Sequence, residues 1–307
     1  VTFFETTLLE RHITKIKKVE IAGPGFINIS LSNEALVFII NDIINEDKHF
    51  GSAKTNFSYN IEFVSANPTG PMHIGHCRGA VFGDVLSNLL KFNGNKVTKE
   101  YYINDYGNQI KNFVRSVYLR IREIKFKEKF KNEEELYPGE YIKEIAKKIL
   151  ENNSKLDFDN FEKSEKILTK ESLKYSMNII KSDLSNLGIT HDNFFSETDI
   201  VSQNLVNKAI ELLKNNNYVE EGFLNPPKGE EKKNWKKIKR LLFKSSLFGD
   251  DVDRALQKND GSWTYFANDV AYHSDKISRK FNKLINILGA DHTGYIKRIS
   301  AAVSALS

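Results

Sequence analysis

The chain has 307 residues, of which 40% are hydrophobic and 28% charged, a composition typical of a soluble globular protein with one large domain or two smaller ones. Its 45 Lys and Arg residues against 40 Asp and Glu residues give a formal net charge of +5, a mild excess that is compatible with a polyanionic partner. The single Cys77 excludes an internal disulfide and favours a reducing compartment. No apolar run has the length of a membrane span, and none at the start predicts a signal peptide.

The first fifty residues predict part of a small α/β module. Val19–Ser32 alternates apolar and polar residues around Gly23-Pro24-Gly25, which predicts two short strands and a turn. Asn33 is expected to cap a helix over Glu34–Ile44. The polar segment Lys48–Ser58 is then expected to be a linker to the next domain.

A strand–helix–strand unit follows this linker. The sequence predicts a strand at Tyr59–Ser65, a helix at Gly75–Phe92 with Gly94 as its C-cap, and a strand at Lys96–Ile103. This spacing is typical of a parallel sheet with a crossover helix. Ligands bind beyond the carboxyl ends of the strands in such sheets, where the loop Asn67–His76 is expected to lie.

The alternation is then interrupted by a long, mostly helical block. Helices are expected at Glu140–Leu150, Phe161–Leu187 and Val201–Leu213, a loop at His191–Asp199, and strands at Tyr218–Phe223 and Arg240–Phe248 around the basic run Lys228–Lys239. We interpret this block as an insertion into a nucleotide-binding fold. The alternation resumes with a strand at Trp263–Phe266, a helix at Asn268–Phe281, a strand at Leu284–Leu288 and a helix from Gly294.

Two histidines are the first candidates for chemistry. His73 and His76 flank Gly75 at a predicted helix N-terminus, where unpaired N–H groups and the helix dipole favour a phosphate. They could donate hydrogen bonds to charge that develops on phosphorus. Capping or core histidines remain an alternative, whereas a metal site is disfavoured because no further His or Cys lies at ligand spacing.

Polar residues at the ends of predicted strands are the second group of candidates. Glu62, Ser65 and Asn67 lead into the histidine loop and could hold a cationic ligand, although such residues can also be simply solvated. Tyr265 and Asp269 are one helical turn apart, and the helix dipole alone could explain Asp269. After the predicted strand Leu284–Leu288, Asp291 and His292 could contact ribose hydroxyls and a base, or this segment could form a simple turn.

Taken together, six segments resemble the bacterial type of arginyl-tRNA synthetase, a family of class I aminoacyl-tRNA synthetases. They are EFVSANPTGPMHIGHCRGAVFGD (62–84), EYYINDYGNQI (100–110), YPGEYIKEIA (137–146), FGDDVDRAL (248–256), DGSWTYFANDVAYHSDK (260–276) and GADHTGYIKR (289–298). The resemblance implies an α/β fold: a Rossmann-like nucleotide-binding domain at 51–307 with a largely helical insertion at about 112–255, preceded at 1–50 by a remnant of a small α/β add-on domain.

The resemblance also implies the reaction and the site. L-Arginine and ATP would give arginyl-adenylate and pyrophosphate, and the arginyl group would pass to the terminal ribose of tRNA(Arg). It implies that His73 and His76 are catalytic and that the arginine-binding residues are Glu62, Ser65, Asn67, Tyr265 and Asp269. The implied ATP-binding residues are Pro71, Met72, His73, Ile74, Gly75, His76, Gly289, Asp291 and His292. Mg²⁺ would bind together with ATP, and no protein ligand is assigned to it. The family resemblance further implies a cytoplasmic monomer.

Several departures from the family pattern affect these expectations. The chain starts at Val1 inside an amphipathic segment and stops at Ser307 within a predicted helix, so we expect a fragment. The Lys-Met-Ser-Lys-like loop and the anticodon-binding domain would follow Ser307, and most of the add-on domain would precede Val1. Within the segment FGDDVDRAL (248–256), Val252 also replaces a Lys that the family usually has at this position. We therefore expect weak or no charging of tRNA by this chain alone.

Other functions compete with this prediction. A small adenylyl- or cytidylyltransferase shares the histidine motif but needs neither the insertion nor the Tyr265–Asp269 pair. A sibling class I synthetase would differ in the amino acid that it binds. An RNA-binding module derived from a synthetase would bind tRNA with a steep salt dependence and would not bind ATP.

Overall fold

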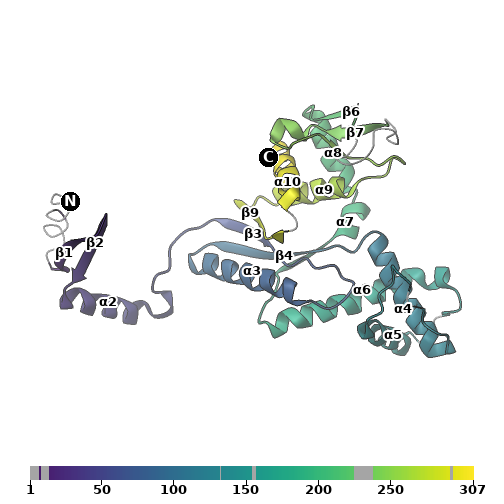
Figure 1. Cartoon of the computed structure of the whole chain (residues 1–307), viewed down its shortest axis with the longest axis horizontal. Coiled ribbons are helices and arrows are strands. Elements are labelled where there is room, and N and C mark those ends of the chain that lie inside the picture. The colour runs from purple at the N-terminus through teal and green to yellow at the C-terminus, as the bar shows by residue number, and fades with distance from the viewer. Residues whose placement is uncertain (1–6, 8–13, 132, 154–156, 225–237, 291–292) are drawn as a thin grey trace. The chain divides into compact units, whose positions relative to one another are not determined.

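The computed structural model describes residues 7, 14–131, 133–153, 157–224, 238–290 and 293–307, which form two compact units (Figure 1). The first unit comprises the described residues up to Thr55 together with Phe92–Gly94. Strands β1 (Ile16–Ala22) and β2 (Phe26–Leu31) pair antiparallel, which confirms the two predicted strands. Gly23 and Gly25 both have positive φ in the turn between them, a conformation that glycine adopts without strain.

Helix α2 (Asn33–Glu46) follows this hairpin and is capped one residue earlier than expected. The side chain of Ser32 accepts a hydrogen bond of 3.0 Å from the backbone N–H of Ala35, so Ser32 and not Asn33 is the N-cap. Ser32 adopts an extended conformation that leaves its hydroxyl facing the first turn, whereas Asn33 is already helical. A single 3₁₀ turn, η1 (Asp47–His49), ends this region.

The second unit is built on a four-stranded parallel sheet in the order β5-β4-β3-β9. Its strands are β3 (Ser58–Glu62), β4 (Lys96–Ile103), β5 (Asn193–Ser196) and β9 (Lys283–Asn286). Helix α3 (Ile74–Phe92) connects β3 to β4, which confirms the predicted parallel unit. Ile61, Phe63 and Tyr101 of the sheet region pack with Ala80 of α3 and Met177 of the long helix α6 (Phe161–Asn186) in one buried cluster.

The structure places a strand inside the block that was predicted to be one insertion. The segment expected as a loop at His191–Asp199 contains β5, which pairs with β4, and the start of α7 (Glu197–Ser202). That expectation was wrong because four residues, Asn-Phe-Phe-Ser, are too few to show a periodic pattern. Before β5 lie α4 (Asn108–Phe126), α5 (Glu140–Asn152) and α6, which share a core of their own.

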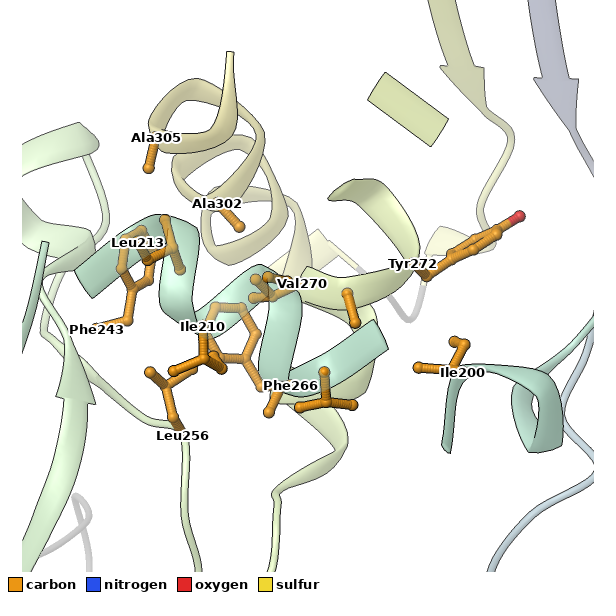
Figure 2. Packing of buried hydrophobic residues seen from close by; sticks show 14 of the residues in the cluster. Ile200, Ile210, Leu213, Phe243, Leu256, Phe266, Val270, Tyr272, Ala302 and Ala305 are labelled. Carbon is orange, nitrogen blue, oxygen red and sulfur yellow. The ribbon is translucent and has the colours of Figure 1, made fainter. Parts of the chain in front are cut away.

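The region between β5 and β9 forms a third core (Figure 2). It contains α7, α8 (Leu205–Asn215), β6 (Val219–Phe223), β7 (Lys239–Phe243), η3 (Ser245–Phe248), β8 (Arg254–Ala255), α9 (Tyr265–Ser278) and, after β9, α10 (Thr293–Leu306). The helix predicted at 201–213 is therefore two helices, and the strand predicted at 240–248 ends at Phe243. The basic run 228–239 lies largely outside the described residues.

A strand predicted at Trp263–Phe266 is absent from the described structure at those positions. Thr264 instead caps α9, because its side chain accepts a hydrogen bond from the N–H of Ala267. The aromatic and β-branched residues that favoured a strand lie at the start of the helix, and Trp263 forms only an isolated bridge with Gln257. Tyr265 and Asp269 therefore both belong to the first turns of α9.

Candidate active site

Acidic side chains at or just after the ends of three strands, and one from helix α9, converge at the carboxyl edge of the parallel sheet. Glu62 ends β3, Asp105 follows β4, and Glu197 follows β5 directly as the first residue of α7. Asp269 comes from α9. Burial raises the pKa of one phenol, Tyr102 of β4, and the charges of all four carboxylates raise it further. This shared effect shows that the carboxylates surround a common region.

Burial disfavours the ionised forms of Asp269 and Glu197. Burial raises the pKa of Asp269 well above its usual range, and the nearby Glu197 and Glu62 raise it further. Burial and Asp105 raise the pKa of Glu197 against the opposing hydrogen bond of 2.9 Å from Asn268. Carboxylates with raised pKa values in such a setting are what a cationic ligand would stabilise.

These two carboxylates and Asp105 have neutral hydrogen-bond partners. Tyr295 of α10 donates its phenol O–H to Asp269, and Asp105 accepts from the hydroxyl of Ser196 at 2.6 Å and from the N–H of Thr198 at 2.9 Å. Across the ranges that the structure describes, no Lys or Arg side chain forms an ion pair with any of the three. We call Asp105, Glu197 and Asp269 the unpaired acidic cluster.

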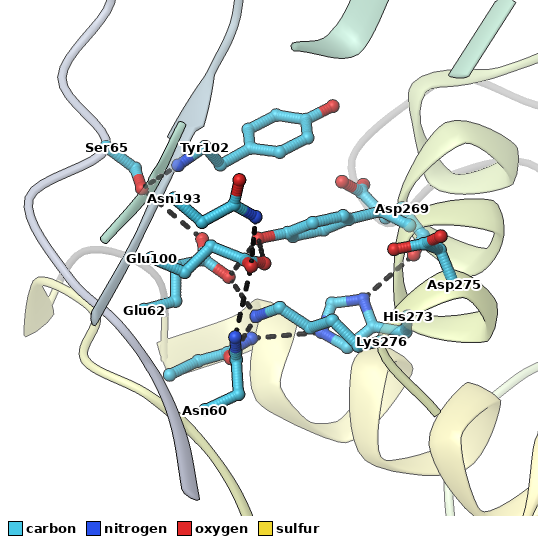
Figure 3. A network of polar contacts seen from close by, with 12 residues as sticks. Asn60, Glu62, Ser65, Glu100, Tyr102, Asn193, Asp269, His273, Asp275 and Lys276 are labelled. Carbon is cyan, nitrogen blue, oxygen red and sulfur yellow. Dashed lines mark hydrogen bonds and ion pairs between the residues drawn. The ribbon is translucent and has the colours of Figure 1, made fainter. Parts of the chain in front are cut away.

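In contrast to the unpaired acidic cluster, Glu62, which the sequence predicts to bind arginine, forms an ion pair with a lysine of the protein. Lys276 of α9 forms an ion pair with its Oε2 and also donates a hydrogen bond of 2.9 Å to Asn286 of β9 (Figure 3). The hydroxyl of Tyr272 lies 3.0 Å from the same carboxylate oxygen. Lys276 is fully buried, and Glu62 is 8% exposed. Its carboxylate is therefore already neutralised within the protein.

Ser65 and Asn67 occupy the turn that follows β3. The Ser65 hydroxyl accepts the N–H of Tyr102 at 3.0 Å and lies 3.4 Å from Glu62, so it joins β3 to β4. Val64 and Ser65 have φ values of 70° and 42°, a left-handed conformation that is strained for a β-branched residue. Asn67 is exposed and exchanges amide hydrogen bonds with Gln109 at 2.8 Å and Asn104 at 3.1 Å.

Tyr265 lies at the surface and not among the acidic residues that accompany it in the prediction. Its side chain is 60% exposed, and the ammonium of Lys258 lies 5.6 Å from the ring centroid. Asp269, four residues later on the same helix, faces the acidic region. The structure therefore places these two residues in different environments.

The two histidines lie together at the N-terminus of α3. Their rings stack with centroids 3.7 Å apart and planes inclined by 25°. The backbone N–H of Gly75 donates to Nδ1 of His73 at 3.1 Å, and the N–H of His73 donates to Nδ1 of His76 at 3.3 Å. Burial and the neighbouring His73 lower the pKa of His76. In the neutral form of each ring, the proton is then on Nε2.

Of the other residues predicted to bind ATP, four lie in or next to this turn and the rest follow β9. Pro71 and Ile74 are exposed, and the N–H of Met72 donates to Asp183 of α6 at 3.1 Å, which fixes the turn against that helix. A Cβ at Gly75 would lie 3.0 Å from the ring of His73, so glycine leaves room for the stacked pair. Gly289 is exposed after β9, while Asp291 and His292 lie outside the described residues.

Sequence reasoning missed several polar residues that the structure brings to this region: Tyr102, Asp105, Glu197, Lys276 and Tyr295. Glu197 lies in the segment that was expected to be a loop, and recognition of β5 would have placed it at the sheet edge. In the described part of the chain, no group of three His, Cys, Asp or Glu side chains is arranged to hold a metal ion, and no helix there is long and apolar enough to cross a membrane.

Comparison with known families identifies the class of protein. Residues 39–307 match the model of the class I tRNA synthetase (R) catalytic domain. Because this match covers most of the chain, the chain belongs to that family, which confirms the prediction from the sequence.

The individual relatives are more specific. The chain is 55% identical over 98% of its length to an arginine–tRNA ligase of Pelagibacter ubique, and 51% identical over 95% to one of Wolbachia pipientis wMel. These matches cover 52% and 51% of the two relatives, so the chain spans about half their length.

Solved structures agree with the fold. A crystal structure of a Campylobacter jejuni protein superimposes with a TM-score of 0.78 at 37% identity, covering 90% of this chain and 57% of that one. Thermus thermophilus arginyl-tRNA synthetase gives a TM-score of 0.65 at 17% identity, covering 99% of this chain and 54% of that one, which supports the fold alone.

Proposed function

We propose that the protein is an arginine–tRNA ligase in which the unpaired acidic cluster binds the guanidinium of L-arginine beside a nucleotide held at the N-terminus of α3. The single observation that supports this assignment most strongly is the contrast between the acidic residues. Glu62 has its own cation in Lys276, whereas Asp105, Glu197 and Asp269 pair with no Lys or Arg within the described ranges. A bound cation would stabilise their ionised forms.

A guanidinium matches this cluster better than a point charge does. It is planar and always charged, and it presents five N–H donors that suit carboxylate oxygens from several directions. Asp269 and Glu197 come from different elements, α9 and α7, and the charge of Glu197 raises the pKa of Asp269. A delocalised cation between them would relieve both.

The stacked histidines fit the role of phosphate ligands. Their Nδ1 atoms accept backbone N–H groups of the turn, so both neutral rings can donate from Nε2. In the activation step, the arginine carboxylate attacks the α-phosphorus of ATP, the bond to the β-phosphate oxygen breaks, and pyrophosphate leaves. Hydrogen bonds from His73 and His76 would stabilise the charge on the phosphoryl oxygens.

The second step and the remaining partners follow from the same proposal. A ribose hydroxyl at the 3′ end of tRNA(Arg) would attack the carbonyl carbon of arginyl-adenylate, lose its proton and release AMP. Mg²⁺ would enter with ATP, for which the described residues supply no assigned ligand set. A cytoplasmic monomer is the proposed state, and the single Cys77 suits a reducing compartment.

Arginine-dependent exchange of pyrophosphate into ATP, with and without tRNA, tests the function. It should be measured on this chain and on the full-length relative from Pelagibacter ubique. The substitution that corresponds to His76→Asn, made in the full-length relative, should reduce exchange at least about 100-fold. The affinity for arginine should stay within about twofold of the unaltered enzyme. Exchange driven equally well by other amino acids would contradict the assignment of arginine, and unaltered exchange in the histidine variant would contradict the role of α3.

A further inference from the structure

We propose that Lys276 is a positioning residue that acts through Glu62: it neutralises this carboxylate and fixes α9, so that the unpaired acidic cluster alone receives the arginine side chain. This inference rests on the proposed function, because it assigns a role in the same site. Lys276 has no contact with the cluster itself among the hydrogen bonds and ion pairs of the described residues.

The geometry shows how one ammonium holds three elements together. Lys276 lies on α9, and its Nζ contacts Glu62 at the end of β3 and the side-chain oxygen of Asn286 at the end of β9, the latter at 2.9 Å. It also lies 4.5 Å from the ring centroid of Tyr272, one turn earlier on α9. Because Lys276 has no exposed surface, loss of these partners would leave a buried charge without compensation.

A relay of hydrogen bonds extends this anchor to Asp269 (Figure 3). The side-chain amide of Asn286 donates to Nε2 of His273 at 2.9 Å, so the other ring nitrogen, Nδ1, donates to the backbone carbonyl of Asp269 at 2.8 Å. Asp269, Tyr272, His273 and Lys276 are spaced at i, i+3, i+4 and i+7 and therefore share one face of α9. Lys276 thus helps to aim this face at the strand ends.

The charge of Lys276 matters as much as its contacts. The negative charge of Glu62 opposes ionisation of Asp269, and Lys276 offsets that charge. Without Lys276, Asp269 would hold its proton more tightly, and a protonated carboxyl group cannot form an ion pair with a guanidinium. Loss of Lys276 should therefore weaken arginine binding, although removal of its positive charge makes the region more negative.

Calorimetry on this chain tests the proposal with a double substitution and a matched control. Lys276→Met should weaken arginine binding at least tenfold and leave ATP affinity within twofold. The pair Lys276→Met with Glu62→Gln, which removes both charges, should recover most of the arginine affinity. Lys99→Met breaks another buried ion pair of the same sheet, with Asp84 at 2.5 Å, and should leave arginine affinity unchanged.

The outcomes separate the two proposals. A wild-type chain that binds no arginine overturns the proposed function and this role with it. If the wild-type chain binds arginine and Lys276→Met, shown to be folded by circular dichroism, binds it equally well, the role of Lys276 alone is overturned. An equal loss of arginine and ATP binding, or no recovery in the double variant, would likewise reduce Lys276 to a purely structural residue and overturn the proposal.

Discussion

Glu100 offers the sharpest test of the polar network under the site. This carboxylate of β4 is fully buried and forms an ion pair with Arg279, which approaches it with two guanidinium nitrogens. It also accepts hydrogen bonds from Asn193 at 2.7 Å, Tyr272 at 2.7 Å and Asn60 at 3.1 Å. Glu100→Gln removes the charge and leaves Arg279 without its carboxylate.

The expected magnitude follows from the pKa of this group. Burial alone would raise the pKa of Glu100, but the hydrogen bonds from Arg279, Asn193 and Tyr272 outweigh burial and lower it from 4.5 to about 2. This difference corresponds to about 3 kcal/mol of stability at neutral pH. Because the unfolded chain binds the proton more tightly, the contribution is complete above pH 4.5 and is lost as the pH falls towards 2.

Urea denaturation followed by circular dichroism measures the effect. At pH 7, Glu100→Gln should lower the free energy of unfolding by about 3 kcal/mol, and at pH 3 by only about 1 kcal/mol. The control Glu140→Gln alters a carboxylate that is 75% exposed and 3.8 Å from Lys143, and should change stability by less than about 0.5 kcal/mol. A loss below about 1 kcal/mol at pH 7, or one that is the same at both pH values, would show that the ionised form of Glu100 does not stabilise the fold in this way.

Three further changes have defined outcomes in the same denaturation assay. Burial lowers the pKa of His191 to about 4, so stability should fall by about 3 kcal/mol between pH 6.5 and 4. His191→Gln should abolish this part of the pH dependence, and an unchanged profile in the variant would contradict the prediction. Gly83→Ala would place a Cβ 2.2 Å from the ring of Phe63 and should cost about 1–3 kcal/mol, whereas Gly79→Ala, with nothing within 4 Å, should stabilise by up to about 1 kcal/mol; equal effects would refute the packing argument. Thr264→Ala removes the N-cap of α9 and should cost about 1 kcal/mol, and no loss would show that the cap is dispensable.

The elements around α3 could be predicted from the sequence because their signals are local. An apolar run before Asn67 and Pro68, and then the glycine and histidines, predict a strand, a loop and a helix, and the helix begins at Ile74, one residue before the expected position. The start of α9 could not be predicted in the same way. Its aromatic residues favour a strand, whereas in the structure the side chain of Thr264 accepts the backbone N–H of Ala267 and caps a helix there.

The composition of the acidic region depends on contacts between distant parts of the chain. Glu62 and Lys276 are separated by 214 residues, and nothing in the local sequence shows that one neutralises the other. Glu197 reaches the site only because the short β5 pairs with β4. The sequence could therefore identify Asp269 as a candidate, but not which acidic residues remain available to a ligand.

Calorimetry with arginine and its neutral isostere citrulline measures whether the unpaired acidic cluster binds a cationic side chain. Arginine should bind at least about 100-fold more tightly than citrulline, since a partly buried acidic site discriminates strongly against a ligand that lacks the charge. Its affinity should rise with pH, because the pKa of Asp269 is raised and its proton must leave. Asp269→Asn should remove most of the preference. Comparable binding of citrulline by the unaltered chain would show that the cluster does not bind a cationic side chain.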